Sequence, residues 1–247
     1  MTAAVTFDFH NTLATCDEWF DLEVRHLVSA FMRWQGAAEG TDVDPTLLAE
    51  ADAAYRRLRE SIMLDGRELT AEMCVARILS ELDRPGNEAT IAQGVETLMR
   101  GTFAGVAPVP GAVDTVRELA ASGVPLGIVS NAVYHPFLEW TLDQFGMRDA
   151  FAEVTTSASG GFYKSRPELF WHTIAGLGAT PERSVHVGDS FRFDVGGAKR
   201  AGMKTVWLSG GAEGPPAGSP PPDLTLSSLS GASPAIIDLL RSEPASA

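Results

Sequence analysis

The sequence predicts an α/β protein, a doubly wound parallel sheet with an all-helical segment inserted after the first strand. Before residue 14 and after residue 104, short β-branched or apolar runs alternate with helix-length stretches, which is typical of βαβ units. Between those positions, apolar residues recur three and four residues apart, as in amphipathic helices. We therefore expect a sheet domain from residues 1–13 and 105–247, and an inserted helical domain from residues 14–104.

The individual elements follow from the same patterns. Strands are expected at residues 4–9, 126–130, 154–156, 184–187 and 204–208. Helices of the sheet domain are expected at residues 111–122, 134–145, 167–177 and 194–201. The insertion should contain helices at residues 16–36, 45–64, 68–83 and 87–103. A Gly/Pro-rich loop at residues 209–222 precedes a last short strand and helix within residues 223–241.

Charge and composition narrow the possible functions. The chain of 247 residues has 32 acidic and 19 basic side chains and a formal net charge of −13, which argues against a nucleic-acid partner. Residues 14–104 hold 17 of the acids and 9 of the bases, so the acid excess is concentrated in the insertion. No apolar run reaches the length of a membrane helix, and no signal peptide is evident. With only two cysteines, a cytoplasmic protein is expected; the oligomeric state is not predicted.

Polar side chains follow several of the predicted strands. Asp8 follows the first strand, Ser130 and Asn131 end the second, and Asp189 follows the strand at 184–187. Because ligands of open parallel sheets bind at the carboxyl ends of the strands, these residues should be close together. Each alone is also explained by a turn or a helix cap. Their order on successive strands makes a shared site the better interpretation.

Two further features favour a site for an anion and a cation. Lys164 is one of only three lysines in the chain and precedes a helix that begins with proline. Asp189 and Asp194 stand five residues apart across a glycine-containing turn, where two carboxylates can converge on one hard cation. His186, in the middle of a strand, is expected to pack within the sheet.

Together these motifs resemble those of the haloacid dehalogenase-like hydrolase superfamily. The matching segments are D-F-H-N-T at residues 8–12, Ser130, Lys164, and G-D-S-F-R-F-D at residues 188–194. The resemblance covers essentially the whole chain and implies a Rossmann-like core with a helical cap at residues 14–104. It also implies that the cap closes over the site, with hinges near residues 13–16 and 104–110.

The resemblance further implies an enzyme, a hydrolase that cleaves a small phosphomonoester. Asp8 would attack phosphorus and form an aspartyl-phosphate, which water then hydrolyses. Mg²⁺ would be held by Asp8, the backbone carbonyl of His10, Asp189 and Asp194. The residues expected to bind the phosphoryl oxygens are Thr12, Ser130, Asn131 and Lys164, and Lys164 would also neutralise Asp8. The expected partner is a small phosphorylated metabolite.

One residue departs from the pattern of the phosphatases in this superfamily. His10 stands where a second aspartate usually protonates the leaving oxygen and activates water. Imidazole can perform the same proton transfers, so His10 is one candidate for the general acid and base. Alternatively, it packs against the cap and hydrolysis of the intermediate is slow. Both interpretations remain open at this point.

The departure at His10 leaves two alternative functions. The 2-haloacid dehalogenases of the superfamily carry an aromatic residue at this position, need no metal, and use their aspartate to attack carbon. Asp189 and Asp194, which those enzymes usually lack, favour the phosphatase. The other alternative is a non-catalytic binding protein on the same scaffold. The presence of Asp8 and Lys164 argues against it.

Overall fold

A single parallel sheet organises the half of the molecule that carries the motifs. The computed structural model describes residues 2–211, 214 and 218–242. Six strands run in the spatial order β5-β4-β1-β6-β7-β8, and every neighbouring pair is parallel. Their bounds are β1 Val5–Phe7, β4 Leu126–Ser130, β5 Phe151–Thr156, β6 Val185–Gly188, β7 Lys204–Leu208 and β8 Leu224–Leu226. The order reverses at β1, where a parallel sheet forms its ligand crevice.

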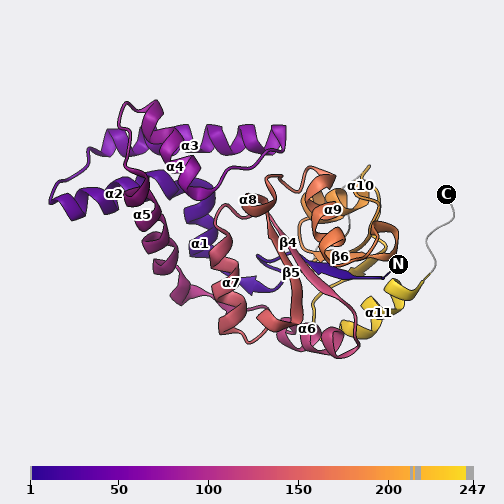
Figure 1. The fold of residues 1–247 in the computed structure, drawn as a ribbon. Helices are drawn as coiled ribbons and strands as arrows, with labels where there is room; N and C mark the ends of the chain where they lie inside the picture. The colour runs from indigo at the N-terminus through magenta and orange to yellow at the C-terminus, as the bar shows by residue number, and fades with distance from the viewer. Residues whose placement is uncertain (1, 212–213, 215–217, 243–247) are drawn as a thin grey trace.

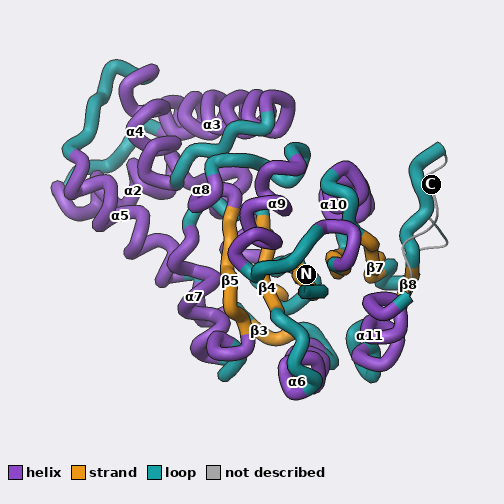
Figure 2. Tube along the Cα trace, turned by 45° about the vertical axis from the view of Figure 1, so that its right-hand side comes forward, coloured by secondary structure: helices purple, strands orange, loops and turns teal. Residues whose placement is uncertain are grey.

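Helices cover both faces of this sheet, as predicted (Figures 1 and 2). Val5 and Phe7 of β1 belong to the apolar cluster shared with α6 (Ala112–Ala121), α7 (His135–Gln144) and α11 (Ser233–Arg241). A second cluster on the opposite face, which includes Val129, is covered by α9 (Pro167–Gly176) and α10 (Gly196–Arg200). The short α8 (Ser157–Gly160) directly follows β5. The prediction of a Rossmann-like α/β fold is confirmed.

The inserted segment is helical over most of its length. Its helices are α1 (Asp17–Asp21), α2 (Leu27–Glu39), α3 (Pro45–Asp65), α4 (Ala71–Glu81) and α5 (Glu88–Gly101). They lie to one side of the sheet in Figure 1. Asp44 caps α3, since its side chain accepts a hydrogen bond from the backbone of Thr46, and Pro45 opens the helix as the sequence predicts.

The first helix of the insertion differs from its prediction. The expected continuous helix at 16–36 is divided into α1, a π-helical turn at Leu22–His26, and α2. The periodicity of apolar residues does not reveal a π turn, because such a turn inserts only a single residue into an otherwise regular helical pattern. A second π turn, Phe191–Val195, replaces the start of the helix expected at 194–201. The second turn contains Asp194, a residue of the predicted site.

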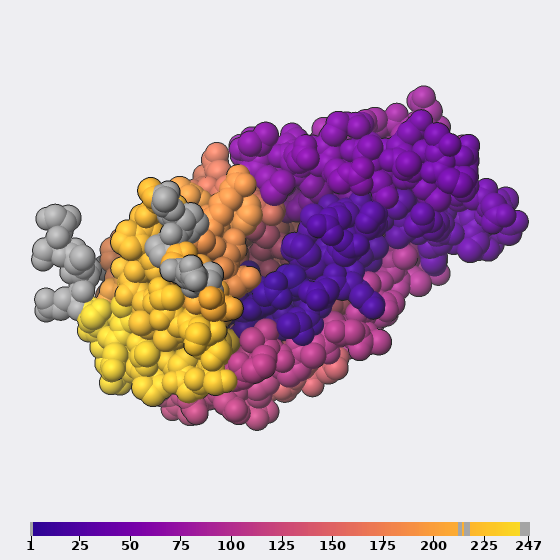
Figure 3. Space-filling model, turned by 180° about the vertical axis from the view of Figure 1, so that it is seen from behind, coloured from indigo at the N-terminus to yellow at the C-terminus, as the bar shows by residue number. Residues whose placement is uncertain are grey.

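The chain passes between the two halves of the molecule along paired strands. β2 (Ala14–Thr15) and β3 (Ala107–Pro108) form a short antiparallel ladder, outside the main sheet. These strands fall within the two segments expected to act as hinges. Seen from behind in Figure 3, the helical segment forms one end of an elongated molecule and the C-terminal half forms the other.

The remaining expectations agree with the structure to within a few residues. β5 begins at Phe151, three residues before the expected start, and the last strand and helix are β8 and α11. The Gly/Pro-rich loop at 209–222 falls partly outside the described residues. Among the described residues, no helix is both long enough and apolar enough to cross a membrane.

Candidate active site

Asp8 is the first residue after β1, at the carboxyl edge of the sheet. Its backbone nitrogen donates to the carbonyl oxygen of Val187 in β6 at 2.8 Å, so the pairing of the two strands continues past Phe7 and fixes the residue. Its side chain shares a face of the sheet with Thr6, because successive residues of a strand alternate. Asp8 is only 8% exposed. A carboxylate this buried needs a charged or hydrogen-bonding partner.

Lys164 supplies that partner. It lies between α8 and α9, is 1% exposed, and donates from Nζ to Oδ1 of Asp8 and, at 2.7 Å, to Oδ1 of Asp194. Its backbone nitrogen donates to Oδ1 of Asn131 at 2.8 Å. Gly197 of α10 allows the helix to approach, since a Cβ there would lie 2.5 Å from the carbonyl oxygen of Lys164. The lysine is therefore held at both its main chain and its ammonium.

Asp194 is fixed by several neighbours. Its Oδ2 accepts from the backbone nitrogen of Ser190 at 2.8 Å, and its Oδ1 lies 3.3 Å from Nε2 of His186. Thr6 of β1 contacts Nδ1 of His186 at 2.9 Å. Gly188 lets the carboxylate lie against the strand end, because a Cβ there would be 2.3 Å from Cγ of Asp194. His186, expected only to pack within the sheet, thus orients an acid of the site.

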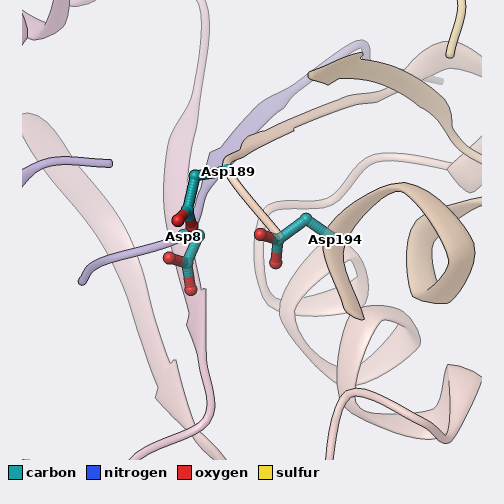
Figure 4. Close-up of side chains that lie close together, drawn as sticks. All are labelled: Asp8, Asp189 and Asp194. Atoms are coloured by element: carbon teal, nitrogen blue, oxygen red, sulfur yellow. The ribbon is translucent and has the colours of Figure 1, made fainter. Parts of the chain in front are cut away.

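Asp189 completes the group of acids. Its carboxylate and those of Asp8 and Asp194 offer oxygens that all lie within 4.8 Å of one another. Figure 4 shows Asp8 and Asp189 side by side, with Asp194 pointing toward them from the chain beyond β6. We call Asp8, Lys164, Asp189 and Asp194 the sheet-edge cluster. Carboxylate oxygens at this spacing are typical ligands of a hard divalent cation.

The acids of this cluster outnumber its one cation, and their pKa values reflect it. Burial raises the pKa of Asp8 to about 7, because Lys164 only partly offsets desolvation and the neighbouring acids add to it. Burial and the charge of Asp194 raise the pKa of Asp189 to about 6. For Asp194, Lys164 and His186 outweigh the effect of burial and hold the pKa at about 2. The cluster therefore has room for further positive charge.

The predicted phosphate-binding residues lie around the same edge. Ser130 is the buried last residue of β4, the strand that pairs with β1 on the side opposite β6. Asn131 follows it, and its side-chain oxygen Oδ1 accepts a hydrogen bond from the backbone nitrogen of Lys164. Thr12 is fully buried, and its Oγ1 has no hydrogen-bond partner within the described part of the chain. The structure brings these residues to the edge of the sheet; their binding of phosphate stays a prediction.

His10 contacts the helical segment. Its ring stacks on Phe20 of α1, with centroids 4.4 Å apart and planes 8° from parallel. Its Nε2 lies 3.4 Å from Oδ1 of Asp17 without meeting hydrogen-bond geometry. Burial lowers the pKa of His10, and Asp17 acts in the opposite direction. The packing interpretation of His10 thus has a contact to support it, whereas proton transfer stays a prediction.

A second buried group of charges, which the sequence analysis missed, joins the helical segment to the sheet. Arg59 of α3 donates to both carboxylate oxygens of Glu68, at 2.5 and 3.1 Å, and Ser157 donates to Oε2 of Glu68 at 2.9 Å. Glu23, in the π turn after α1, accepts from the backbone nitrogen of Val133 at 2.8 Å. We call Glu23, Arg59 and Glu68 the helical cluster. Nothing in the helical periodicity marks these three residues as buried.

Comparison with known proteins now places the chain in a family. The sequence profile of the haloacid dehalogenase-like hydrolases matches residues 2–202. The glyceraldehyde 3-phosphate phosphatase of Methanothermobacter thermautotrophicus is 30% identical over 211 residues, which cover 85% of this chain and 86% of that protein.

Solved structures agree in fold. A phosphatase of this superfamily from Thermococcus onnurineus is 24% identical, covers 99% of this chain and 100% of its own, and has a TM-score of 0.62. A 2-haloacid dehalogenase from Pseudomonas syringae pv. Tomato DC3000 is 21% identical, covers 97% and 99%, and has a TM-score of 0.73. The predictions of a hydrolase and of its superfamily are confirmed. The chain belongs to the haloacid dehalogenase-like hydrolase family.

Proposed function

We propose that the protein is a magnesium-dependent phosphatase that hydrolyses a small phosphomonoester through an aspartyl-phosphate on Asp8. The observation that carries the proposal is the convergence of Asp8, Asp189 and Asp194 beside the buried ammonium of Lys164. An acidic pocket binds a phosphate dianion only where cations outweigh the acids locally. The relative named for its activity on glyceraldehyde 3-phosphate supports the same reaction class.

In the proposed reaction, an oxygen of Asp8 attacks phosphorus while the bond to the leaving oxygen breaks, and that oxygen takes up a proton from solvent and leaves as an alcohol. Water then attacks the acyl phosphate and releases inorganic phosphate, which restores the carboxylate. Lys164 holds Asp8 in place and offsets the negative charge of the transferring group. Thr12 and Ser130 would hydrogen-bond the phosphoryl oxygens. Positioning and charge neutralisation of this kind account for most of the catalysis in phosphoryl transfer.

The residues fit a hard divalent cation. Asp8, Asp189 and the backbone carbonyl of His10 would hold Mg²⁺, which supplies positive charge to the phosphoryl oxygens when it is bound. Both oxygens of Asp194 already have partners within the protein, namely Lys164, His186 and the backbone of Ser190. We therefore assign Asp194 mainly to orienting Lys164 and the acids beside it. The raised pKa values of Asp8 and Asp189 support their assignment as the metal ligands. Acids that hold protons in the metal-free protein can exchange those protons for a metal ion.

His10 is assigned the removal of a proton from the attacking water. Because burial lowers its pKa, the imidazole is neutral near pH 7 and suits the activation of water better than the protonation of a leaving oxygen. Asp17, 3.4 Å from Nε2, would stabilise the imidazolium that forms. Separate replacement of His10 by Ala and by Asp tests the assignment. Full turnover by His10→Ala would exclude it and leave only the stacking contact with Phe20.

Phosphate release from small monophosphates with Mg²⁺, compared between the wild type and Asp8→Asn, tests the main proposal. We expect turnover by the wild type and at least about a 10³-fold loss in the variant, because the nucleophile is removed. Asp8→Asn that retains turnover would overturn the mechanism. Glyceraldehyde 3-phosphate belongs in the substrate panel because of the relatives, and polyanionic substrates are disfavoured by the net charge of −13.

The dehalogenase alternative is tested in the same preparation. The stacked aromatic ring of His10 at this position favours it, while the group of acids favours the phosphatase. Chloride release from 2-chloropropionate without Mg²⁺ would support attack on carbon. We expect none. Absence of both activities, together with a melting temperature unchanged by beryllofluoride and Mg²⁺, would support the non-catalytic binding protein.

A cytoplasmic location is also part of the proposal. Cys16 and Cys74 are both buried and free. Free thiols are typical of proteins kept in a reducing compartment.

A further inference from the structure

The carboxyl group of Glu23 is buried, and only one of its two oxygens has a hydrogen-bond partner among the described residues. Glu23 is 2% exposed, and its Oε1 accepts from the backbone nitrogen of Val133. Its Oε2 is buried and has no hydrogen-bond partner among the residues that the structure describes. Buried polar atoms are rarely left without a partner, so such an atom in a native protein indicates a ligand or water. The π turn that carries Glu23 supports a functional origin, since π turns are frequent at functional sites.

Three observations indicate that Glu23 lies near the predicted reaction centre. Val133 is three residues beyond Ser130, in the loop that follows β4. Phe20, one turn before Glu23, stacks on His10, two residues from the nucleophile. The thiol of Cys16, whose pKa is raised mainly by burial, also lies within electrostatic range of the carboxyl groups of both Glu23 and Asp8. Glu23 is thus placed in the helical segment beside the loop that follows Ser130 and one helical turn from the ring that stacks on His10.

The state of the carboxyl group determines which chemistry it can bind. Burial raises the pKa of Glu23 to about 8, although Arg59 and the backbone of Val133 act in the opposite direction. Burial therefore favours the protonated form of the group. A protonated carboxyl both donates and accepts hydrogen bonds, which matches a hydroxyl group.

We propose that Glu23 is a specificity-determining residue whose free carboxyl oxygen hydrogen-bonds a hydroxyl group on the leaving group of the substrate. The substrate class is a short phosphomonoester of a hydroxylated, uncharged carbon chain. This inference rests on the proposed phosphatase function and adds the choice of leaving group. Because Glu23 is buried in this arrangement, the leaving group reaches it when the helical segment moves about β2 and β3.

A matched pair of esters isolates the contact. Glycerol 3-phosphate and n-propyl phosphate have the same carbon chain, and only the first has hydroxyl groups. We expect Glu23→Leu to lower kcat/KM for glycerol 3-phosphate about tenfold, the value of one hydrogen bond, and to change n-propyl phosphate by less than about twofold. Glu23→Gln, which keeps both a donor and an acceptor, should remain within about threefold of the wild type on both esters. Glu18→Leu, on the exposed side of α1, is the control.

The same comparison excludes a purely structural role. If Glu23→Leu lowers kcat/KM equally for both esters, the residue acts through Val133 and the proposal is wrong. An unchanged value for both esters, as expected if only water satisfies Oε2, also overturns it.

Binding provides a readout that does not depend on turnover. In an Asp8→Asn background, Glu23→Leu should raise the Kd of glycerol 3-phosphate about tenfold by calorimetry and leave that of n-propyl phosphate unchanged. Equal Kd values with and without Glu23 would reject the contact. Wild-type protein that hydrolyses none of the small monophosphates in the panel with Mg²⁺ would reject the phosphatase, and the Kd comparison would still decide the role of Glu23.

Discussion

The sheet-edge cluster and the helical cluster are both buried groups of one cation and several acids, but they differ in how completely the charges are matched. Arg59 and Glu68 form a bidentate pair, and Ser157 occupies the remaining capacity of the carboxylate. At the sheet edge, Lys164 contacts two acids and a third lies beside them. A matched buried pair can be purely structural, whereas an excess of acids around one ammonium is costly unless a further cation binds.

The comparison explains why burial alone does not identify an active site. Arg59 and Glu68 are as buried as Lys164 and Asp194. Each group has one place where a partner is missing: Oε2 of Glu23 in the helical cluster, and positive charge opposite the acids of the sheet-edge cluster. Buried polar groups that lack partners within the protein therefore identify a reactive site better than the extent of their burial does.

Replacement of Lys164 by Met should have the largest effect. It leaves Asp8 and Asp194 buried without their ammonium, so we expect a loss of about 3–5 kcal/mol in the free energy of unfolding at pH 8. Activity per folded molecule should fall about 10³-fold, because the charge opposite the transferring phosphoryl group is gone. Denaturant unfolding and phosphate release measure the two effects. Lys199→Met, which breaks the more exposed pair with Asp223, is the control and should cost at most about 1 kcal/mol.

In the helical cluster, the same type of replacement should affect stability far more than turnover. Arg59→Met leaves Glu68 buried and unpaired, at a cost of about 3–5 kcal/mol in the free energy of unfolding. The double variant Arg59→Met/Glu68→Leu should regain most of that loss, because apolar pairs often substitute for buried ion pairs. Arg57→Met, in the exposed pair with Glu81, is the control. A double variant as unstable as the single one would show that the pair itself stabilises the helical segment.

Gly188→Ala tests the packing that supports the sheet edge. A Cβ at this position would displace Asp194 and, through it, Lys164, so we expect kcat/KM to fall about 10- to 100-fold. Gly101→Ala is the matched control, since a Cβ there meets nothing within 4 Å. Equal activity of the two variants would mean that the position of Asp194 does not matter to turnover.

These cases also show how far the sequence could predict the site. The sequence could predict that three residues meet at the edge of the sheet, namely Asp8, Ser130 and Asp189. Parallel strands end at the same edge, and side chains along a strand alternate between the two faces of the sheet. The burial of Lys164 was not, because it depends on the path between α8 and α9 and on the approach of α10 at Gly197. Only the three-dimensional packing of distant segments creates that environment.

Glu23 shows the same limit in the helical segment. A glutamate in an amphipathic helix is usually solvated, and the apolar residues around it predict only that the helix packs somewhere. Its burial arises from the π turn and from the loop at Val133, which is 110 residues away in the sequence. The His186 contact with Thr6 could have been predicted, since the two residues are partners in the parallel register of β1 and β6.

Binding of Mg²⁺ should depend on pH through the acids of the sheet-edge cluster alone. The raised pKa values of Asp8, about 7, and Asp189, about 6, mean that the metal-free native state keeps protons that the unfolded chain releases near its ordinary value of 3.8. The contribution of these two acids to stability is therefore full below about pH 4 and is lost as the pH rises toward 7. Asp194 acts in the opposite direction, and its contribution is lost as the pH falls from about 4 to 2.

Because Mg²⁺ must displace those protons, its apparent affinity should rise by up to about a hundredfold per pH unit below pH 6, where both acids are protonated, by up to about tenfold per unit between pH 6 and 7, and level off above pH 8. The increase in Tm on adding Mg²⁺ should follow the same course. Asp189→Asn should weaken the dependence, since it removes one of the two protons. The double replacement of Arg59 and Glu68 should leave it unchanged, because the helical cluster holds no site for the ion. An increase in Tm that is equal at pH 5 and pH 8 would place the metal away from Asp8 and Asp189.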